Sequence, residues 1–82
     1  MRKARIRLSG VSEKEIRNMA LFAQAASRFR SNIWIAKGDR RANGKSVLSL
    51  MALASIKDGD ACLLAEGTDE ETAVKHLSGL FD

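Results

Sequence analysis

The pattern of apolar and polar positions changes its period early in the chain. Lys3–Leu8 alternates strictly between basic and apolar residues, which predicts a strand with one buried face. From Ser12 to about residues 27–28, apolar residues recur at helical spacing in a run rich in strong helix formers. The apolar positions of this expected helix are Ile16, Met19, Ala20, Phe22, Ala23, Ala26 and Phe29.

The middle of the chain predicts a hairpin and a short helix. Asn32–Lys37 is β-branched and aromatic, and the turn formers Gly38-Asp39 lead into a short polar strand over residues 40–43. Ser46 can then begin a brief helix over Val47–Leu53, because its hydroxyl can accept a hydrogen bond from an early backbone N–H.

The last third of the chain predicts a fourth strand and a final helix. A turn at residues 57–60 precedes a strand over Ala61–Glu66. Thr68, with Glu71 three residues later, matches the signature of a capping hydroxyl, and a helix is expected from about Asp69 nearly to the end. The apolar residues of that helix are Ala73, Val74, Leu77, Leu80 and Phe81.

These elements run in the order strand, helix, strand, strand, helix, strand, helix, with no linker, repeat or low-complexity segment between them. The order predicts an α+β fold in which the helices cover one face of an antiparallel sheet. Eighty-two residues suffice for one small domain, so we expect a single domain over residues 1–82.

The net charge of +4 hides an asymmetry along the chain. Residues 1–45 carry twelve Lys and Arg against three Asp and Glu, whereas residues 46–82 carry two against seven. Such a distribution could steer an acidic partner or a nucleic acid toward one side of the domain. Alternating charges on solvated faces would give the same count, so both interpretations stay open.

Several classes of protein are disfavoured by composition. No stretch approaches the roughly 20 apolar residues of a membrane span or forms a signal peptide, so we expect a cytoplasmic protein without membrane contact. Cys62 is the only cysteine and His76 the only histidine, which excludes an internal disulfide and a Cys/His zinc cluster. We predict no metal, no cofactor and no enzymatic activity of its own.

Four stretches of the chain recur at the joint spacing of one known family. They are Arg17–Phe29; Gly44-Lys45-Ser46 followed by Val47, Leu48, Met51 and Leu53; Ala65–Glu71; and Ala73–Leu77. The chain thus resembles the HPr family, the small phosphocarriers of the bacterial sugar phosphotransferase system and their Crh-like paralogues. The resemblance implies an open-faced β-sandwich, with a four-stranded antiparallel sheet and three helices on one face (βαββαβα).

Residue 15 departs from this resemblance. In the family, a histidine just before the first helix accepts phosphate from an upstream enzyme and passes it to a sugar transporter component, within a His-x-Arg-Pro motif. Here the motif begins with Glu15 and keeps Arg17, but the proline is absent. His76 falls in the middle of the last expected helix, far along the chain. The resemblance therefore implies a remnant phosphate site, Ser12 and Arg17, without a catalytic residue.

Three roles for Glu15 are open. Ser12 and Glu15 have capping-box spacing, so the segment could wind into an extra helical turn, with Glu13 and Glu15 near the positive helix N-terminus. Alternatively, the charge of Glu15 beside Arg17 could imitate a phosphorylated histidine toward a partner. A carboxylate can also form an acyl phosphate, which would make the chain a phosphocarrier with an altered acceptor.

The resemblance implies a second site at Ser46. Relatives in Gram-positive bacteria are phosphorylated on the matching serine by HPr kinase/phosphorylase, and Lys45 precedes it here. Val47, Leu48 and Met51 correspond to an apolar patch that relatives present to partners, including a catabolite control regulator. We expect a regulatory or adaptor module that works through Ser46 and this patch. The alternative is that Ser46 is only a helix cap.

The sheet should leave one face uncovered. If the helices cover Ala4, Ile6, Leu8, Ile33, Ile35, Ala61, Leu63 and Ala65, then Arg5, Arg7, Trp34, Cys62 and Leu64 lie on the other side. This face is a candidate homodimer or partner surface, and shielding of Trp34 by arginine stems is the alternative. Nucleic acid is not an expected partner, because the sheet offers one aromatic residue and no recognition motif.

Overall fold

A computed structural model of the chain describes residues 1–56 and 59–81, and within them four strands form one antiparallel sheet. The strands are β1 (Arg2–Arg7), β2 (Asn32–Lys37), β3 (Arg40–Asn43) and β4 (Asp60–Glu66). Their order across the sheet is β1-β4-β2-β3, so β1 and β3 are the edge strands. Strand β4 lies between β1 and β2, so the last strand of the chain pairs with the first.

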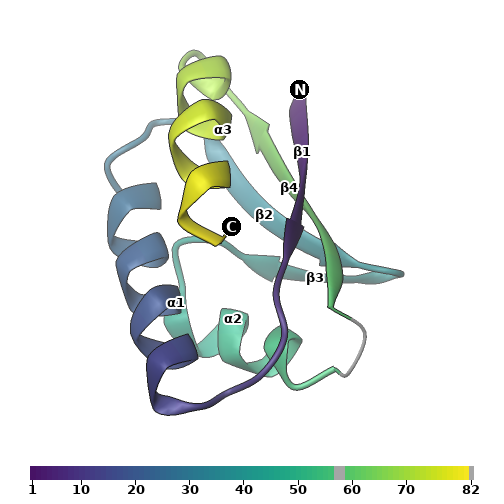
Figure 1. The fold of residues 1–82 in the computed structure, drawn as a ribbon. Coiled ribbons are helices and arrows are strands. Elements are labelled where there is room, and N and C mark those ends of the chain that lie inside the picture. Colours follow the sequence, from purple (N-terminus) through teal and green to yellow (C-terminus); the bar gives the residue numbers. More distant parts are fainter. Residues whose placement is uncertain (57–58, 82) are drawn as a thin grey trace.

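The helices cover one face of this sheet (Figure 1). They are α1 (Glu13–Ala26), α2 (Val47–Ala54) and α3 (Glu70–Ser78), and α3 continues into a short 3-10 turn, η1 (Gly79–Phe81). The α+β open-faced sandwich expected from the sequence is therefore confirmed. No helix within residues 1–56 and 59–81 is long and apolar enough to cross a membrane.

The core lies between the sheet and the helices. Its largest fully buried side chains include Met19, Phe22, Ile33, Ile35, Leu50, Leu63 and Leu77. Phe22 of α1 stacks on Phe81 of η1 with ring centroids 4.7 Å apart, which fastens the last described turn to the first helix. Two of the apolar helix positions were expected to face inward but are exposed, Ala20 on α1 and Leu80 in η1.

Most predicted element boundaries hold to within one residue. Strand β1 begins at Arg2 and ends at Arg7, one residue earlier than expected, and α2 extends to Ala54. The last helix does not continue to the end as one α-helix, because it tightens into the 3-10 turn after Ser78. The predicted turn at residues 57–60 includes Lys57 and Asp58, which lie outside the described residues.

The predicted start of the last helix was wrong. Thr68 does not cap it; the N-cap residue is Asp69, and its side chain makes no capping hydrogen bond to its own helix. The Asp69 carboxylate instead accepts hydrogen bonds from the backbone N–H groups of Arg30 and Ser31, each at 2.9 Å. A long-range contact has thus replaced the local one that the sequence signature predicts.

Candidate functional site

The start of α1 is built as a reciprocal capping box. Ser12 is the N-cap residue, and its hydroxyl accepts a hydrogen bond from the backbone N–H of Glu15 at 3.4 Å. In return, the Glu15 carboxylate accepts from the backbone N–H of Ser12 at 3.0 Å. Hydrogen bonding of the Glu15 carboxylate with the Ser12 side chain, and then with the Ser12 backbone N–H, holds the pKa of Glu15 below its ordinary value of 4.5. Glu15 is therefore inside the helix and already bound as an anion.

Gly10 lies directly against the Glu15 carboxylate. A Cβ atom added at Gly10 would come within 2.3 Å of one carboxylate oxygen and 2.4 Å of the other. Gly10 also has a positive φ of 94°, which favours glycine, and its N–H donates to the carbonyl of Ala54 at 2.9 Å. The glycine thus lets the chain pass close under Glu15 while remaining tied to the end of α2.

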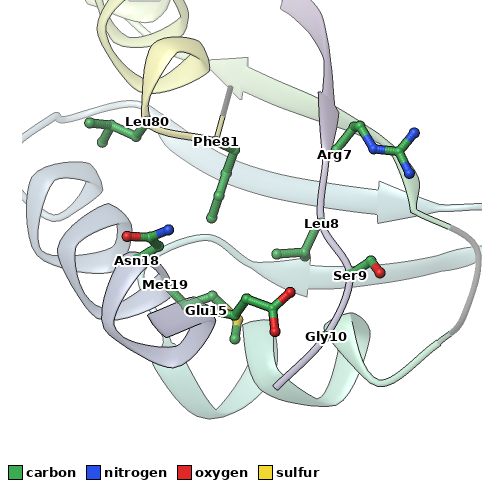
Figure 2. Close-up of a pocket in the computed structure, with 9 residues that line it drawn as sticks. All are labelled: Arg7, Leu8, Ser9, Gly10, Glu15, Asn18, Met19, Leu80 and Phe81. Carbon is green, nitrogen blue, oxygen red and sulfur yellow. The ribbon is translucent and has the colours of Figure 1, made fainter. Parts of the chain in front are cut away.

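A pocket of about 340 Å³ opens beside this helix start (Figure 2). It is lined by Arg7, Leu8, Ser9, Gly10, Glu15, Asn18, Met19, Leu80 and Phe81. Figure 2 shows the Arg7 side chain extending away from Glu15, and its guanidinium pairs with the Asp60 carboxylate at 3.5 Å. The pocket wall therefore presents the Glu15 carboxylate without a cation bound to it in the described contacts.

Arg17 turns toward a different carboxylate from the one expected. Its guanidinium lies 3.4 Å from the Glu13 carboxylate, one helical turn earlier, and its side chain is 67 % exposed. The structure brings Ser12 and Glu15 together, but the contact that it gives Arg17 is with Glu13. The two residues expected as a phosphate-site remnant are thus engaged separately within the first turns of α1.

His76 lies away from the start of α1. It is exposed on α3, and its ring centroid is 6.1 Å from that of Phe29, which follows the C-terminal end of α1. Helix α1 has 14 residues, and such a helix is about 21 Å long. The only histidine of the chain is therefore near the opposite end of α1 from Glu15.

The start of α2 has a simpler cap. Ser46 is the N-cap residue, and its hydroxyl accepts from the backbone N–H of Ser49 at 3.3 Å. No acidic residue lies in the first turn of this helix. The preceding Lys45 directs its ammonium group to the carbonyl of Phe29 at 2.9 Å, which ties the α2 start to the end of α1. Ser46 itself is half-buried.

An apolar patch follows Ser46 on α2. Leu48 is 79 % exposed, while Val47 and Met51 are partly buried against the core. Leu21 on α1, which packs beside α2, is also 55 % exposed and was not singled out from the sequence. The buried positions of α1 are Met19, Phe22, Ala23 and Ala26, and helical spacing leaves Leu21 off that face.

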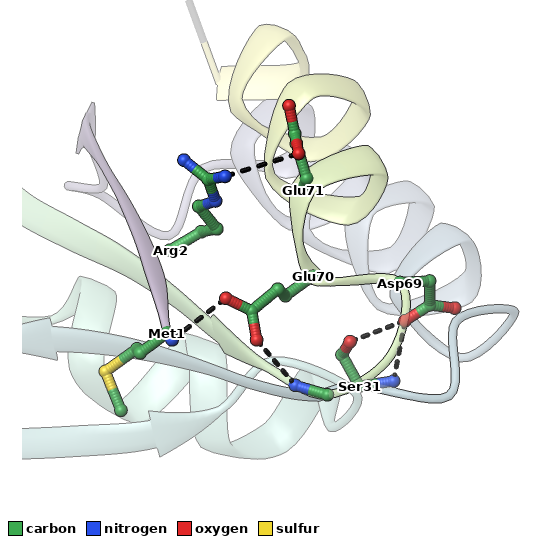
Figure 3. Close-up of polar contacts among 7 residues, drawn as sticks. Met1, Arg2, Ser31, Asp69, Glu70 and Glu71 are labelled. Atoms are coloured by element: carbon green, nitrogen blue, oxygen red, sulfur yellow. Dashed lines mark hydrogen bonds and ion pairs between the residues drawn. The ribbon is translucent and has the colours of Figure 1, made fainter.

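A second polar cluster lies where the start of α3 meets β1 and the loop after α1 (Figure 3). The Asp69 carboxylate accepts hydrogen bonds from the Ser31 hydroxyl and from two backbone N–H groups. These hydrogen bonds lower the pKa of Asp69 to about 2, and the bond from the Ser31 hydroxyl has the largest effect. Glu70 accepts from the N–H of Gly67 at 3.1 Å, and Arg2 of β1 pairs with Glu71 at 3.3 Å. This cluster connects β1, the loop after α1 and α3, which makes its role structural.

Comparison with known proteins identifies the family. A sequence profile described as "PTS HPr component phosphorylation site" matches residues 4–82. The chain belongs to the HPr family. It is 43 % identical over 61 residues to the phosphocarrier protein HPr of Neisseria meningitidis serogroup A, covering 74 % of this chain and 68 % of the relative.

Solved structures of the family agree with this fold. A crystal structure of HPr-C-His from Thermoanaerobacter tengcongensis matches with a TM-score of 0.80 at 36 % identity, covering 99 % of this chain and 91 % of that one. Crh from Bacillus subtilis, whose structure is a swapped, intertwined dimer, matches with a TM-score of 0.76 at 34 % identity, covering 90 % and 82 %. Both phosphocarriers and Crh are thus similar to this HPr-family chain.

The uncovered face of the HPr-type sheet holds Trp34 with a different arginine from those expected. The guanidinium carbon of Arg41 lies 5.9 Å from the Trp34 ring centroid, a distance typical of a cation–π contact. Leu64 pairs directly with Trp34 across the sheet, yet it is only 6 % exposed. Arg5 and Arg7 lie on β1, where they pair with Cys62 and Asp60.

Proposed function

We propose that this HPr-family chain does not carry phosphate on residue 15 and acts as a regulatory or adaptor module through Ser46 and the α2 patch (Val47, Leu48 and Met51). The observation that carries the proposal is the capping box, in which the carboxylate of Glu15 accepts from Ser12 inside α1. The resemblance places a histidine nucleophile at this position. Here the position holds an anion that stabilises the helix start.

The geometry argues against the two rival roles of Glu15. Acyl phosphate formation would require the carboxylate to leave Ser12 and attack a negatively charged phosphoryl donor, which the anion repels. A mimic of phosphohistidine would need Glu15 and Arg17 to act together, but the contact of Arg17 is with Glu13. The acyl phosphate therefore requires the capping box to break first, and the phosphohistidine mimic requires the ion pair between Arg17 and Glu13 to break first.

Ser46 supports the regulatory role through its position at the N-terminus of α2. A phosphate at a helix N-terminus gains from the free backbone N–H groups and the helix dipole. Leu48 lies in the first turn of α2 and is 79 % exposed, so a partner could contact the phosphate and the apolar patch together. By the resemblance, such partners are HPr kinase/phosphorylase and a catabolite control regulator.

We also propose that the chain forms one domain over residues 1–82, acts in the cytoplasm and forms a homodimer in solution. The support for dimerisation is the swapped, intertwined dimer of Crh, which is 34 % identical to this chain. A swapped dimer exchanges a segment between two copies and does not need the uncovered sheet face, so Arg5, Arg7, Trp34 and Leu64 stay a dimer surface only as the alternative drawn from the sequence. Sedimentation analysis of the purified chain tests this, and a monomer at high concentration would reject it.

Two phosphorylation reactions test the main proposal. The purified chain is incubated with the phosphoenolpyruvate-dependent enzyme of the phosphotransferase system, and separately with HPr kinase and ATP, and its intact mass is measured. We expect one acid-stable phosphate from the kinase only. The phosphate should be absent in Ser46→Ala and present in Ser49→Ala, a matched control on the same helix turn.

The outcome of each reaction separates the alternatives. Acid-labile phosphate from the first enzyme that disappears in Glu15→Gln would establish the altered phosphocarrier and reject the proposal. Phosphate in neither reaction would reject both the regulatory site and the phosphocarrier.

A further inference from the structure

The face of the sheet opposite the helices carries two aligned rows of side chains. Strand pairing places Lys3, Leu64, Trp34 and Asn43 in one row, and Arg5, Cys62, Ala36 and Arg41 in the next. The three α-helices lie on the other side of the sheet (Figure 1). The two rows therefore belong to a surface that the described part of the chain leaves uncovered.

Positive charge follows one edge of this face. Lys3, Arg5 and Arg7 alternate along the edge strand β1, so they are roughly 7 Å apart, and all three are exposed. Arg41 adds an exposed cation on the opposite edge strand, β3. Within residues 1–56 and 59–81, the carboxylates of this face are those of Asp60, which pairs with Arg7 at 3.5 Å, and of Glu66, at the end of β4. A linear row of cations is complementary to a polyanion.

Trp34 lies between the two cationic edges, on the inner strand β2. It is half-buried, and the Arg41 guanidinium is held 5.9 Å from its ring centroid. In the neighbouring row, the inner positions are the small residues Ala36 and Cys62, so the surface beside the indole is low. An aromatic ring next to a low, positively bordered surface can stack a base while the cations bind the backbone.

We propose that this uncovered face binds single-stranded nucleic acid, with a base stacked at Trp34 and phosphates along β1 and at Arg41. An acidic polypeptide is the competing ligand, because it would also satisfy the cations. Its acidic side chains have no planar ring to place on the indole, whereas every nucleotide carries one, and the position of Trp34 between the cations therefore favours a nucleic acid. The alignment across strands carries this inference, since it places Arg41 beside Trp34 from a distant part of the sequence.

Trp34 provides its own reporter, because the chain contains one tryptophan. The wild-type chain is titrated with a short oligouridylate while Trp34 fluorescence is followed. The fluorescence anisotropy of the same oligouridylate carrying a dye gives an independent Kd. We expect saturable quenching, and a Kd that weakens roughly twentyfold to fiftyfold between about 50 and 200 mM salt, as expected for three or four phosphate contacts. No saturable binding at the lower salt concentration would overturn the proposal.

Matched variants locate the binding. Arg5→Glu and Arg41→Glu should each weaken binding by about tenfold or more, whereas Arg28→Glu, an exposed site just past α1, should change it less than about threefold. Trp34→Ala should weaken anisotropy-detected binding roughly fivefold to a hundredfold, and Trp34→Phe should restore part of it. Circular dichroism checks that each variant is folded, and the two arginine variants test the site even if Trp34→Ala unfolds.

Two results would assign the face differently. If Arg28→Glu weakens binding as much as Arg41→Glu, the interaction is general electrostatic attraction and the site is rejected. If an oligoglutamate of equal charge binds as tightly and quenches Trp34 equally, the face is assigned to acidic polypeptides instead. Competition between the two ligands at constant ionic strength distinguishes these results from the expected one.

Discussion

The starts of α1 and α2 share the same serine capping hydrogen bond but differ in the residues around it. At each, a serine hydroxyl accepts from the backbone N–H three residues later, at 3.4 Å for Ser12 and 3.3 Å for Ser46. At α1 a carboxylate completes the cap from inside the helix, and Gly10 packs beneath it. At α2 no acidic residue lies in the first turn, and exposed Leu48 follows.

This difference separates a closed helix start from an open one. At α1 the orphan N–H groups and the positive end of the helix already have an internal anion. At α2 the positive end remains available to an external anion, such as a phosphate on the capping serine. The same fold thus presents two helix starts with the same serine cap, of which only the first has an acidic residue in its first turn.

The largest expected effect comes from adding a methyl group beneath Glu15. Gly10→Ala should destabilise the protein by about 2 kcal/mol, because alanine at a positive φ is strained and its Cβ would displace the Glu15 carboxylate. Gly38→Ala is the matched control, since Gly38 has a φ of 58° and no atom near the added Cβ. Urea denaturation measures both.

Comparison with Gly38→Ala separates the cost of the positive φ from the cost of displacing the Glu15 carboxylate. Gly38→Ala should cost only about 1 kcal/mol, and combining Gly10→Ala with Glu15→Ala should bring the Gly10 effect close to that value. Equal losses for the two single alanine variants would show that Glu15 does not hold its position over Gly10.

Removing the two caps gives the next largest effect. Ser12→Ala and Ser46→Ala should each lower the free energy of unfolding by about 1 kcal/mol, as is usual for an N-cap serine. Only the first should couple to a carboxylate, because Ser46 has no acidic partner. A double-mutant cycle between Ser12→Ala and Glu15→Gln should therefore show a coupling energy, and strict additivity would argue against the reciprocal box.

The pH dependence of stability sharpens the comparison further. The pKa of Glu15 is lowered in the folded state by its hydrogen bonds with Ser12, so its stabilisation is present above 4.5 and is lost as the pH falls below that value. The stability difference between wild type and Glu15→Gln should therefore shrink as the pH decreases. Thermal unfolding in buffers on both sides of 4.5 measures this.

The Ser12→Ala background provides the control for the pH experiment. Ser12 is the largest cause of the lowered pKa, so the pH-dependent part of the Glu15→Gln difference should be much smaller there. A difference that grows toward low pH would require the opposite sign of pKa shift.

The smallest effect is expected at Arg17. Its contact with Glu13 at 3.4 Å is an exposed ion pair one helical turn apart, and such pairs contribute about 0.3 to 0.5 kcal/mol. Arg17→Ala should thus change stability no more than that, with Lys14→Ala as a control on the same helix. A much larger loss would indicate that Arg17 supports the capping box directly.

The fold followed from local patterns that the tertiary structure did not override. The strict alternation before Ser9 fixes which face of β1 is buried, and Ser12 with Glu15 forms the capping box that its spacing predicts. The α2 cap at Ser46 was equally local. These features depend on residues within one helical turn or one strand, which is why the sequence alone suffices.

Other features depend on contacts between distant segments. Thr68 and Glu71 have the same spacing as Ser12 and Glu15, yet Asp69 became the N-cap because its carboxylate binds the loop at Ser31. The contact between Arg41 and Trp34 depends on the register of the β2–β3 pairing. Neither partner can be identified from spacing, since loop geometry and sheet register emerge only when the whole chain packs.

The contact between Gly10 and Glu15 also constrains how the sequence can change. While Glu15 occupies its cap, any side chain at position 10 meets the carboxylate at less than contact distance. Substitutions at the two positions are therefore epistatic, and their order matters. A histidine at position 15 would remove the carboxylate that completes the capping box, whereas the Ser12 hydroxyl could still accept from the backbone N–H of residue 15. The side chains tolerated at position 10 therefore depend on the residue at position 15.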